Sequence, residues 1–316
     1  MISLCGDETM DYELGIIGAG PAGYAASIYA VRAGVQTALF DTHAGGGLAS
    51  IAPNIENYPG FSSITGADLL EKMKDHAKVY VDFHEYEQII SIDKKEDGFI
   101  LKTAEEKHYQ VAAIIIATGT NHRRLHAEGA EQLQGKGISY CATCDGFFFR
   151  DKTVAVVGGG NSALIEAVYL KQIGCKTVYL IHRRDKLRAE DAYEHDAKEA
   201  DVTFLLNKVI RRINGDQQVE SIELEDTTNG EMKTITVDGV FISIGVIPQN
   251  DLAKQLDVAL DDQGYIKVDC HMRTSVPHVY AAGDITGGLR QVITAAAEGA
   301  IAGLISTEAV GKQYPY

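Results

Sequence analysis

Two cysteines separated by two residues, Cys141 and Cys144, carry the most reactive chemistry in this sequence. The C-x-x-C spacing brings two sulfurs close enough to bridge, and the start of a helix stabilises a thiolate. Such a pair accepts two electrons when its disulfide opens and can pass them to another disulfide. Structural zinc is the other use of C-x-x-C, but no second C-x-x-C or C-x-x-H pair completes a site. We therefore predict a redox dithiol and no metal.

An acidic residue, Asp145, directly follows the second cysteine. If ionised, its carboxylate would raise the pKa of a neighbouring thiol. If burial raises the pKa of Asp145 itself, the carboxyl group instead holds a proton for a leaving thiolate. We favour the proton-donor role, with helix capping as the alternative.

Two glycine-rich turns flank the dithiol, at 18–23 and 158–163. Their glycines allow close approach of the backbone to a pyrophosphate, which then rests on a helix N-terminus. Each turn is expected between a strand and a helix. The expected elements are strands at 12–18, 36–41, 153–157 and 177–181, and helices at 24–33 and 164–173. The repeated strand–turn–helix–strand order predicts two dinucleotide sites.

The two sites differ at the end of the strand that follows each turn. In the first, Asp41 lies 18 residues beyond the last glycine, where an acid can bond a ribose hydroxyl group. In the second, the corresponding residues are His182, Arg183 and Arg184, followed by Arg188. A 2′-phosphate requires positive, bidentate donors and is repelled by a carboxylate. The second site should therefore prefer NADPH to NADH; a solvated charge at a strand end is the alternative in both cases.

The length of 316 residues and the separation of about 140 residues between the turns fit two domains. Apolar strands at 114–117 and 240–244 each end in turn-forming residues, so the chain should leave the first domain near Gly119 and return near Gly245. The first domain is then discontinuous, and its last part holds a strand at 279–284 and a helical run from about 290 to 310. The expected boundaries are 1–120, 121–247 and 248–316.

Composition argues against several other classes of protein. There are 44 acidic against 29 basic residues, and the net charge of −15 repels phosphate backbones and anionic lipid. The first 13 residues lack a signal-peptide core, and no uninterrupted apolar run approaches membrane-spanning length. The remaining cysteines, Cys5, Cys175 and Cys270, are scattered, unlike a secreted disulfide framework. We expect a cytoplasmic protein with no nucleic-acid or membrane partner.

Two nucleotide sites and one dithiol indicate an electron relay. A nicotinamide delivers a hydride, whereas a disulfide takes up electrons as thiolates. A second cofactor, for which a flavin is expected, must convert hydride transfer into the transfer of an electron pair to the disulfide.

The motifs resemble those of the low-molecular-weight thioredoxin reductases of bacterial and archaeal type, which are FAD-dependent pyridine nucleotide-disulfide oxidoreductases. The resemblance covers nearly all of the chain. The matching segments are Gly18 to Gly23, Ile55 to Gly60, Ala117 to Gly119, Cys141 to Gly146, Gly158 to Ala163, His182 to Arg184 with Arg188, and Ala282 to Asp284 with Arg290 and Gln291.

This resemblance implies an α/β homodimer of two Rossmann-like domains, each a three-layer ββα unit, with the NADPH domain inserted into the FAD domain. FAD would be bound by Gly18, Gly20, Gly23, Asp41, Gly46, Gly47, Leu48, Asn57, Gly119, Asp284, Arg290, Gln291 and Val292. NADPH would be bound by Gly158, Gly160, Asn161, Ser162, His182, Arg183, Arg184 and Arg188. Cys144 would be nearer the flavin, Cys141 its disulfide partner and Asp145 the acid.

The resemblance also implies NADPH-dependent reduction of a thioredoxin or glutaredoxin-like protein, with rotation of the smaller domain between two half-reactions. The chain departs from the family at Gly47, where a glutamine amide is usual, and at Asp41, where glutamate is common. Other readings are a dithiol oxidase that uses oxygen, a ferredoxin- or flavodoxin-coupled NADP reductase, and a non-catalytic redox sensor. A deazaflavin or ferredoxin as electron donor is a further alternative. The arginine cluster argues against the oxidase and the other electron donors, and the C-x-x-C pair argues against the ferredoxin- or flavodoxin-coupled reductase.

Overall fold

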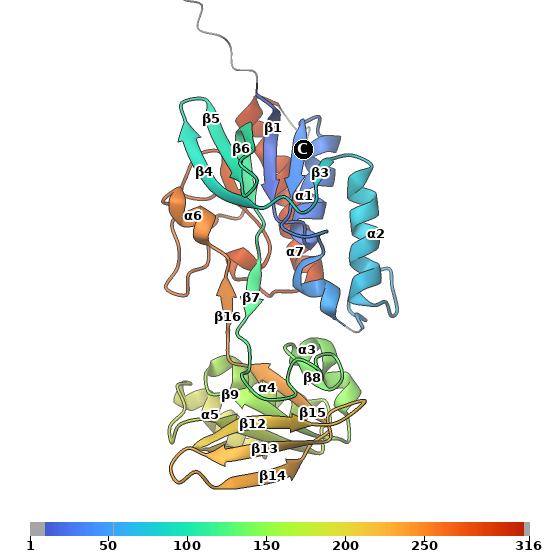
Figure 1. Ribbon diagram of the computed structural model, residues 1–316, viewed down its shortest axis with the longest axis vertical. Coiled ribbons are helices and arrows are strands. Elements are labelled where there is room, and N and C mark those ends of the chain that lie inside the picture. Colours follow the sequence, from blue (N-terminus) through green and yellow to red (C-terminus); the bar gives the residue numbers. More distant parts are fainter. Residues whose placement is uncertain (1–9, 53, 313–316) are drawn as a thin grey trace, which may run out of the picture. The chain divides into compact units, whose positions relative to one another are not determined.

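The computed structural model describes residues 10–52 and 54–312, and these form two compact units. Unit 1 takes the described residues of 1–53, 58–121 and 247–316, and unit 2 consists of 54–57 and 122–246. Cys5 lies outside the described residues. Each unit combines a parallel sheet, a smaller antiparallel layer and helices (Figure 1), so the α/β fold class is confirmed.

The centre of unit 1 is a parallel sheet in the order β3-β2-β1-β6-β17. Its strands are β1 (Tyr12–Ile17), β2 (Thr37–Phe40), β3 (Asp82–His84), β6 (His108–Ile116) and β17 (Val279–Ala281). The antiparallel layer adds β4 (Ile89–Lys95) and β5 (Gly98–Thr103). β6 belongs to both layers, since its residues 108–111 pair with β5 and its residues 114–116 with β17.

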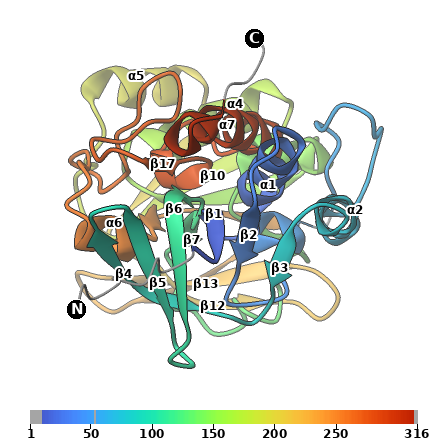
Figure 2. The ribbon, with the colours of Figure 1, turned by 90° about the horizontal axis from the view of Figure 1, so that it is seen from above.

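Helices α1 and α7 lie side by side on one face of the unit 1 sheet (Figure 2). The helices of this unit are α1 (Pro21–Arg32), α2 (Gly66–Lys78), α6 (Asp251–Gln255) and α7 (Val292–Ile305), with 3-10 turns η1 (Gly47–Ile51), η3 (Asp284–Thr286) and η4 (Ser306–Val310). Two glycines of α7 permit close packing: a Cβ on Gly299 would lie 2.1 Å from the Ala22 carbonyl oxygen, and one on Gly303 2.4 Å from that of Ala26.

Val292–Val310 is the one segment of the described residues that is apolar and long enough to cross a membrane, by length and composition alone. Its two acidic residues both have partners in unit 1. Glu298 accepts hydrogen bonds at the loop before η3, and Glu308 accepts one of 2.7 Å from Arg273. These bonds and the packing on α1 hold this segment against unit 1.

Unit 2 repeats the same plan, with a parallel sheet in the order β11-β10-β9-β15-β8. Its strands are β8 (Ile138–Ser139), β9 (Thr153–Gly158), β10 (Thr177–His182), β11 (Thr203–Leu206) and β15 (Gly239–Ser243). The antiparallel layer is β12 (Lys208–Asn214), β13 (Ser221–Asp226) and β14 (Met232–Thr236), and the helices are α3 (Ala142–Asp145), α4 (Asn161–Gln172) and α5 (Asp191–Glu199).

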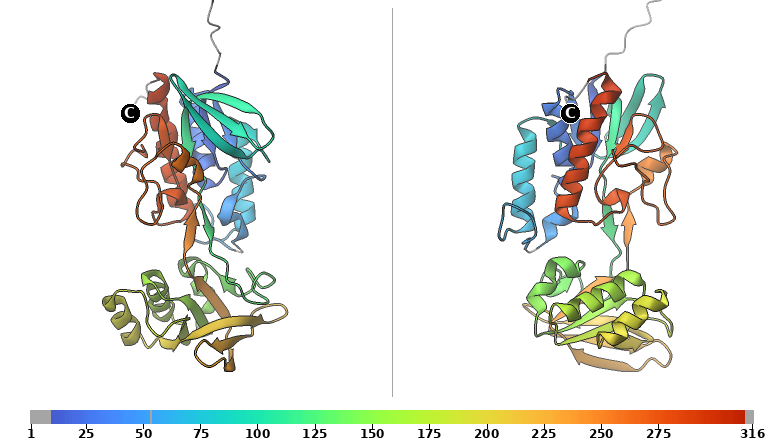
Figure 3. Two further views of the ribbon diagram at one scale, coloured as in Figure 1. Left: turned by 60° about the vertical axis from the view of Figure 1, so that its left-hand side comes forward. Right: turned by 180° about the vertical axis from the view of Figure 1, so that it is seen from behind.

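Side-chain alternation along β9 explains the three layers of unit 2. Val154 and Val156 share a buried cluster with residues of α4, whereas Ala155 and Val157 share another with β12 and β13. Successive residues of a strand point to opposite faces, so one apolar strand supplies both interfaces. Figure 3 shows α4 and α5 on one face of the sheet and β12 to β14 on the other.

The two crossing segments of the chain pair as a two-stranded ribbon, β7 (Thr120–His122) with β16 (Val246–Pro248). Within unit 1 the Gln249 N–H donates to the Gly119 carbonyl at 3.0 Å, and within unit 2 the Arg123 N–H donates to that of Gly245 at 3.1 Å. Both crossings are therefore held by backbone hydrogen bonds.

Several element boundaries differ from the sequence-based expectation. α1 and α4 begin at Pro21 and Asn161, three residues early, because the last residues of each glycine turn already adopt helical geometry. β6 begins at His108 because its polar first half pairs with β5. The C-terminal run is helical only to Ile305 and continues as η4.

Candidate active site

The first glycine turn is fixed by contacts that exclude side chains. Gly18 has φ of +107°, and a Cβ there would lie 2.3 Å from the Ala117 carbonyl oxygen. Gly23 lies in the first turn of α1, where a Cβ would lie 1.9 Å from the Gly18 carbonyl oxygen. The strand end, the turn and the helix therefore approach one another to backbone distance, which only glycine permits.

Asp41, at the end of β2, joins the turn to its neighbouring loop. Its Oδ2 accepts a 2.7 Å hydrogen bond from the Ala19 N–H, and its Oδ1 accepts one of 2.8 Å from the His43 N–H. The Gly46 N–H donates to the Ala19 carbonyl at 2.7 Å. Three segments of the predicted FAD site thus meet at the carboxyl end of the parallel sheet.

Two further glycines leave an open cradle at this place. Gly20 is the N-cap of α1, and a Cβ there would meet no atom within 4 Å. Gly47 faces it, since a Cβ on Gly47 would meet only the Gly20 Cα, at 3.8 Å. Free backbone donors at a helix N-terminus, with no side chain in front, suit the pyrophosphate of a dinucleotide.

A half-buried carboxyl group, that of Asp284 in η3, follows β17. Burial raises the pKa of Asp284, the nearby Arg290 lowers it and Glu298 raises it. None of the described residues donates a hydrogen bond to the Asp284 side chain. Its acceptor capacity suits the hydroxyl groups of a bound cofactor.

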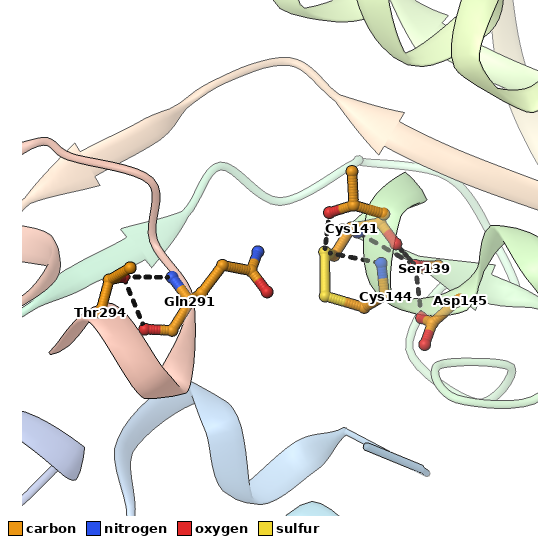
Figure 4. The surroundings of a disulfide bond; sticks show 7 residues. Ser139, Cys141, Cys144, Asp145, Gln291 and Thr294 are labelled. Atoms are coloured by element: carbon orange, nitrogen blue, oxygen red, sulfur yellow. Dashed lines mark hydrogen bonds between the residues drawn. A yellow bond between two sulfur atoms is a disulfide. The ribbon is translucent and has the colours of Figure 1, made fainter. Parts of the chain in front are cut away.

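Glu298 of α7 holds the loop that carries Asp284. Its Oε2 accepts hydrogen bonds from the Gly283 N–H at 2.8 Å and from the Thr286 hydroxyl at 2.9 Å. The helix itself starts with a capping box between Gln291 and Thr294 (Figure 4). Sequence reasoning missed Glu298 because its partners lie up to 15 residues away and depend on how α7 packs.

The remaining residues predicted to bind FAD differ in their solvent exposure and lie in different elements. Leu48 is half-buried in η1, and Val292 is the first residue of α7. Gly119 has φ of +67° with open space at its Cβ position, and Arg290 is exposed. Asn57 is exposed and groups with unit 2.

The second glycine turn is built like the first, at the carboxyl end of β9. A Cβ on Gly158 would lie 2.4 Å from the Ser243 carbonyl oxygen, whereas one on Gly160, the N-cap of α4, would meet nothing within 4 Å. Ser162 is exposed in the first turn of α4. Asn161 exchanges two hydrogen bonds with Glu190, one donated by its amide at 2.8 Å and one accepted from the Glu190 N–H at 3.0 Å.

His182 has a different environment from the arginines that follow it. It is buried, and its Nδ1 lies 3.1 Å from the Gly158 carbonyl oxygen. Its pKa is lowered chiefly by burial. The side chain packs against the turn, where it supports the backbone, and its assignment to the NADPH site stays a prediction.

The basic segment after β10 is exposed and tied to the turn. Arg183, Arg184 and Arg188 are exposed, and none of them forms an ion pair with a described residue. The Arg188 N–H donates to the Gly159 carbonyl at 2.7 Å. Three uncompensated guanidinium groups beside a free helix N-terminus form a strongly anion-attracting surface.

Cys141 and Cys144 form a disulfide with their Cα atoms 5.3 Å apart. Cys141 is the N-cap of α3, and its sulfur accepts a 3.2 Å hydrogen bond from the Cys144 N–H. The Thr143 hydroxyl also lies 3.3 Å from this sulfur. Donors aimed at the Cys141 sulfur favour its thiolate once the disulfide opens.

Asp145 is the last residue of α3, and burial raises its pKa while a hydrogen bond from Ser139 lowers it. The Ser139 hydroxyl lies 2.6 Å from Asp145 Oδ2, and Asp145 Oδ1 is buried with no hydrogen-bond partner among the described residues (Figure 4). This environment favours a protonated carboxyl group next to the disulfide. Ser139 was not identified from the sequence.

Within residues 10–52 and 54–312, no group of three or more His, Cys, Asp or Glu side chains is arranged to hold a metal ion.

The sequence and fold have clear relatives. A thioredoxin reductase of Listeria innocua is 44% identical over 300 residues, which cover 94% of this chain and 93% of the relative. One of Bacillus subtilis is 40% identical over 93% of both chains. The thioredoxin reductase structure from Streptococcus pyogenes matches with a TM-score of 0.90 at 38% identity, covering 96% of this chain and 99% of that one. Residues 12–299 match the model for pyridine nucleotide-disulphide oxidoreductases, and the chain belongs to this family.

Proposed function

We propose that this protein is an NADPH-dependent thioredoxin-disulfide reductase. The observation that carries this proposal is the content of unit 2, which combines a reducible Cys141–Cys144 disulfide, a half-buried acid and an uncompensated arginine cluster at a dinucleotide turn. The relatives named thioredoxin reductase, at 40–44% identity over most of the chain, support the same activity.

NADPH is proposed to bind at the second glycine turn. Gly158, Gly160, Asn161 and Ser162 form the turn and the start of α4, where the pyrophosphate would rest. Arg183, Arg184 and Arg188 would bind the 2′-phosphate, which a carboxylate in that position would repel. His182 would support the turn from beneath.

FAD is proposed to bind in unit 1, where the open cradle fits a dinucleotide. Gly20 would face the pyrophosphate, and Gly18 and Gly23 would permit the tight turn that carries it. Asp41 would face the adenosine ribose, and Asp284 the hydroxyl groups beyond it. The other residues of unit 1 assigned to this site are Gly46, Gly47, Leu48, Gly119, Arg290, Gln291 and Val292, and the family resemblance adds Asn57. Bound FAD would supply the conversion between hydride transfer and transfer of an electron pair to a disulfide.

The chain's own residues would then manage the sulfur chemistry. Opening the disulfide leaves electron density on Cys141, where the Cys144 N–H and the Thr143 hydroxyl can stabilise it. Asp145 would donate a proton. Cys144 is proposed as the sulfur nearer the flavin, and a rotation of unit 2 about the β7–β16 ribbon would separate the two half-reactions.

The remaining assignments rest on the family resemblance. We propose a homodimer, a cytoplasmic location and an oxidised thioredoxin or glutaredoxin-like protein as substrate. The net charge of −15 argues against nucleic acid and anionic membranes as partners.

The test is an anaerobic titration of the purified flavoprotein with NADPH and, separately, NADH. We expect NADPH to bleach the flavin absorbance and an oxidised thioredoxin to restore it. NADH should act only at much higher concentration. Bleaching without reoxidation by thioredoxin would contradict the substrate assignment, and no bleaching by either nucleotide would point to another electron donor or to a dithiol oxidase.

A further inference from the structure

The hydroxyl group of Ser139 joins the redox disulfide to the half-buried carboxyl group of Asp145. It accepts a 3.0 Å hydrogen bond from the Cys141 N–H, lies 2.6 Å from Asp145 Oδ2 and lies 3.3 Å from the Cys141 carbonyl oxygen (Figure 4). Ser139 is buried, and its backbone is held in β8, where it pairs with Phe241 of β15. The hydroxyl position is therefore set by the sheet.

A serine hydroxyl has one proton and two lone pairs, so Ser139 can donate to Asp145 Oδ2 or to the Cys141 carbonyl oxygen, but not to both at once. When Asp145 is ionised, Ser139 donates to Oδ2 and accepts from the Cys141 N–H. When Asp145 is protonated, its O–H can donate to Ser139 Oγ, which then accepts twice and turns its own proton toward the Cys141 carbonyl oxygen. Rotation of the Ser139 hydroxyl proton about the Cβ–Oγ bond satisfies the hydrogen bonds of both protonation states of Asp145, with no movement of heavy atoms.

We propose that Ser139 is a positioning residue that holds Asp145 ready both to keep and to release the proton used in disulfide reduction. This inference rests on the proposed thioredoxin reductase function. Asp145 Oδ1 has no hydrogen-bond partner among the described residues, so Ser139 is the donor that stabilises the newly formed carboxylate.

Reduction of the Cys141–Cys144 disulfide to two thiols requires two electrons and two protons. Bound FAD would supply the chemistry by which two electrons and one proton from NADPH reach the Cys141–Cys144 disulfide. The S–S bond breaks, and Asp145 supplies the second proton, so that the products are two thiols and the Asp145 carboxylate. Ser139 then donates to that carboxylate until solvent returns a proton.

The experiment compares Ser139→Ala, Ser139→Thr, Asp145→Asn and the double variant Ser139→Ala with Asp145→Asn, each as the FAD-loaded enzyme. Stopped-flow absorbance follows electron transfer to the disulfide, and turnover is measured with NADPH and an oxidised thioredoxin. Reduction of ferricyanide by NADPH bypasses the dithiol and reports the earlier step. Ser221→Ala on β13 is the matched control, because it removes a hydroxyl group from the same unit away from the disulfide.

We expect Ser139→Ala to slow electron transfer to the disulfide by about tenfold or more, with ferricyanide reduction unchanged. Ser139→Thr, which keeps the hydroxyl group, should stay within about threefold of the wild type. In the Asp145→Asn background, Ser139→Ala should change the rate by less than about twofold, because its effect passes through the acid.

A difference infrared titration adds a readout that does not depend on turnover. Loss of the Ser139 hydroxyl group should move deprotonation of Asp145 to higher pH, because the carboxylate loses the hydrogen bond that Ser139 donates. Asp145→Asn identifies the band.

An active wild type with a normal Ser139→Ala variant would overturn the role of Ser139. If Ser139→Ala slows electron transfer to the disulfide as much in the Asp145→Asn background as in the wild type, the role of Ser139 is also overturned. Ser139 would then act only through the Cys141 N–H. If Ser139→Ala does not fold, Ser139→Gly removes the same hydroxyl group and is subject to the same expectations. Failure of the wild type itself to be reduced by NADPH would count against the proposed function instead.

Discussion

The imidazole ring of His182 fills the space that a side chain on Gly159 would need. A Cβ on Gly159 would lie 2.2 Å from His182 Nδ1, the nitrogen that also contacts the Gly158 carbonyl oxygen. The glycine at 159 is therefore required by a neighbouring side chain, whereas the glycine at 160 faces open space. Two adjacent glycines of one turn serve different purposes.

Alanine substitutions at Gly159 and Gly160 test this difference in the role of the two glycines. Gly159→Ala should displace the His182 ring and lower the free energy of unfolding by about 1–3 kcal/mol in the absence of nucleotide. Gly160→Ala should leave it within about 1 kcal/mol, because a Cβ there meets no atom of the chain. Thermal unfolding of the two variants measures this. Equal destabilisation would contradict the packing role of His182.

The buried His182 also predicts a pH dependence of stability. Its pKa is lowered from the ordinary value of 6.5, chiefly by burial, with Arg188 and Arg184 adding to the effect. Below about pH 6.5 the unfolded chain binds a proton that the folded chain does not, so stability is present above this pH and is lost as the pH falls. The loss is at most about 1.4 kcal/mol per pH unit.

The check is urea unfolding of the wild type and of His182→Asn between pH 7.5 and 5.5. Asparagine keeps an N–H donor for the Gly158 carbonyl and does not titrate. The wild type should lose more stability than the variant over this interval. Parallel pH profiles would show that His182 binds a proton equally well in both states.

The arginine cluster predicts nucleotide preference. Arg183→Ala combined with Arg184→Ala should raise the KM for NADPH on the order of 100-fold, because two charge-assisted bonds to the 2′-phosphate are lost. The KM for NADH should change little. Steady-state kinetics with both nucleotides decides the question. Arg211→Ala, which removes an exposed arginine paired with Glu225 in the same unit, is the control. Equal effects on both nucleotides would remove the 2′-phosphate assignment.

The features that could be predicted from sequence are those with local causes. The conformation of Gly18, with its positive φ, and the apolar strand before it are encoded within a few residues, so both turns and the fold class were predictable. The Cys141–Cys144 pair is equally local.

The features that the sequence did not reveal depend on the tertiary structure. Glu298 reaches Gly283 only because α7 packs on α1, and the burial of His182 depends on where β10 ends beneath the turn. Neither contact has a spacing that a motif could reveal. Ser139 lies only six residues from Asp145, but its role depends on β8 joining the sheet.

The close packing of α7 on α1 reverses the usual effect of glycine replacement in a helix. Gly→Ala normally stabilises a helix by about 1 kcal/mol. At Gly303, however, the new Cβ would lie 2.4 Å from the Ala26 carbonyl oxygen and 3.0 Å from its Cα. We expect Gly303→Ala to lower the free energy of unfolding by about 1–3 kcal/mol, because backbone rather than a flexible side chain must move.

The same substitution should weaken flavin retention, since α1 begins at the first glycine turn and would shift with its helix axis. Urea unfolding and the flavin-to-protein absorbance ratio after gel filtration measure the two effects. Ala297→Ser, on an exposed position of α7, should change stability by less than about 0.5 kcal/mol. A stabilised Gly303→Ala variant would mean that the α1–α7 contact is looser than the glycine geometry requires.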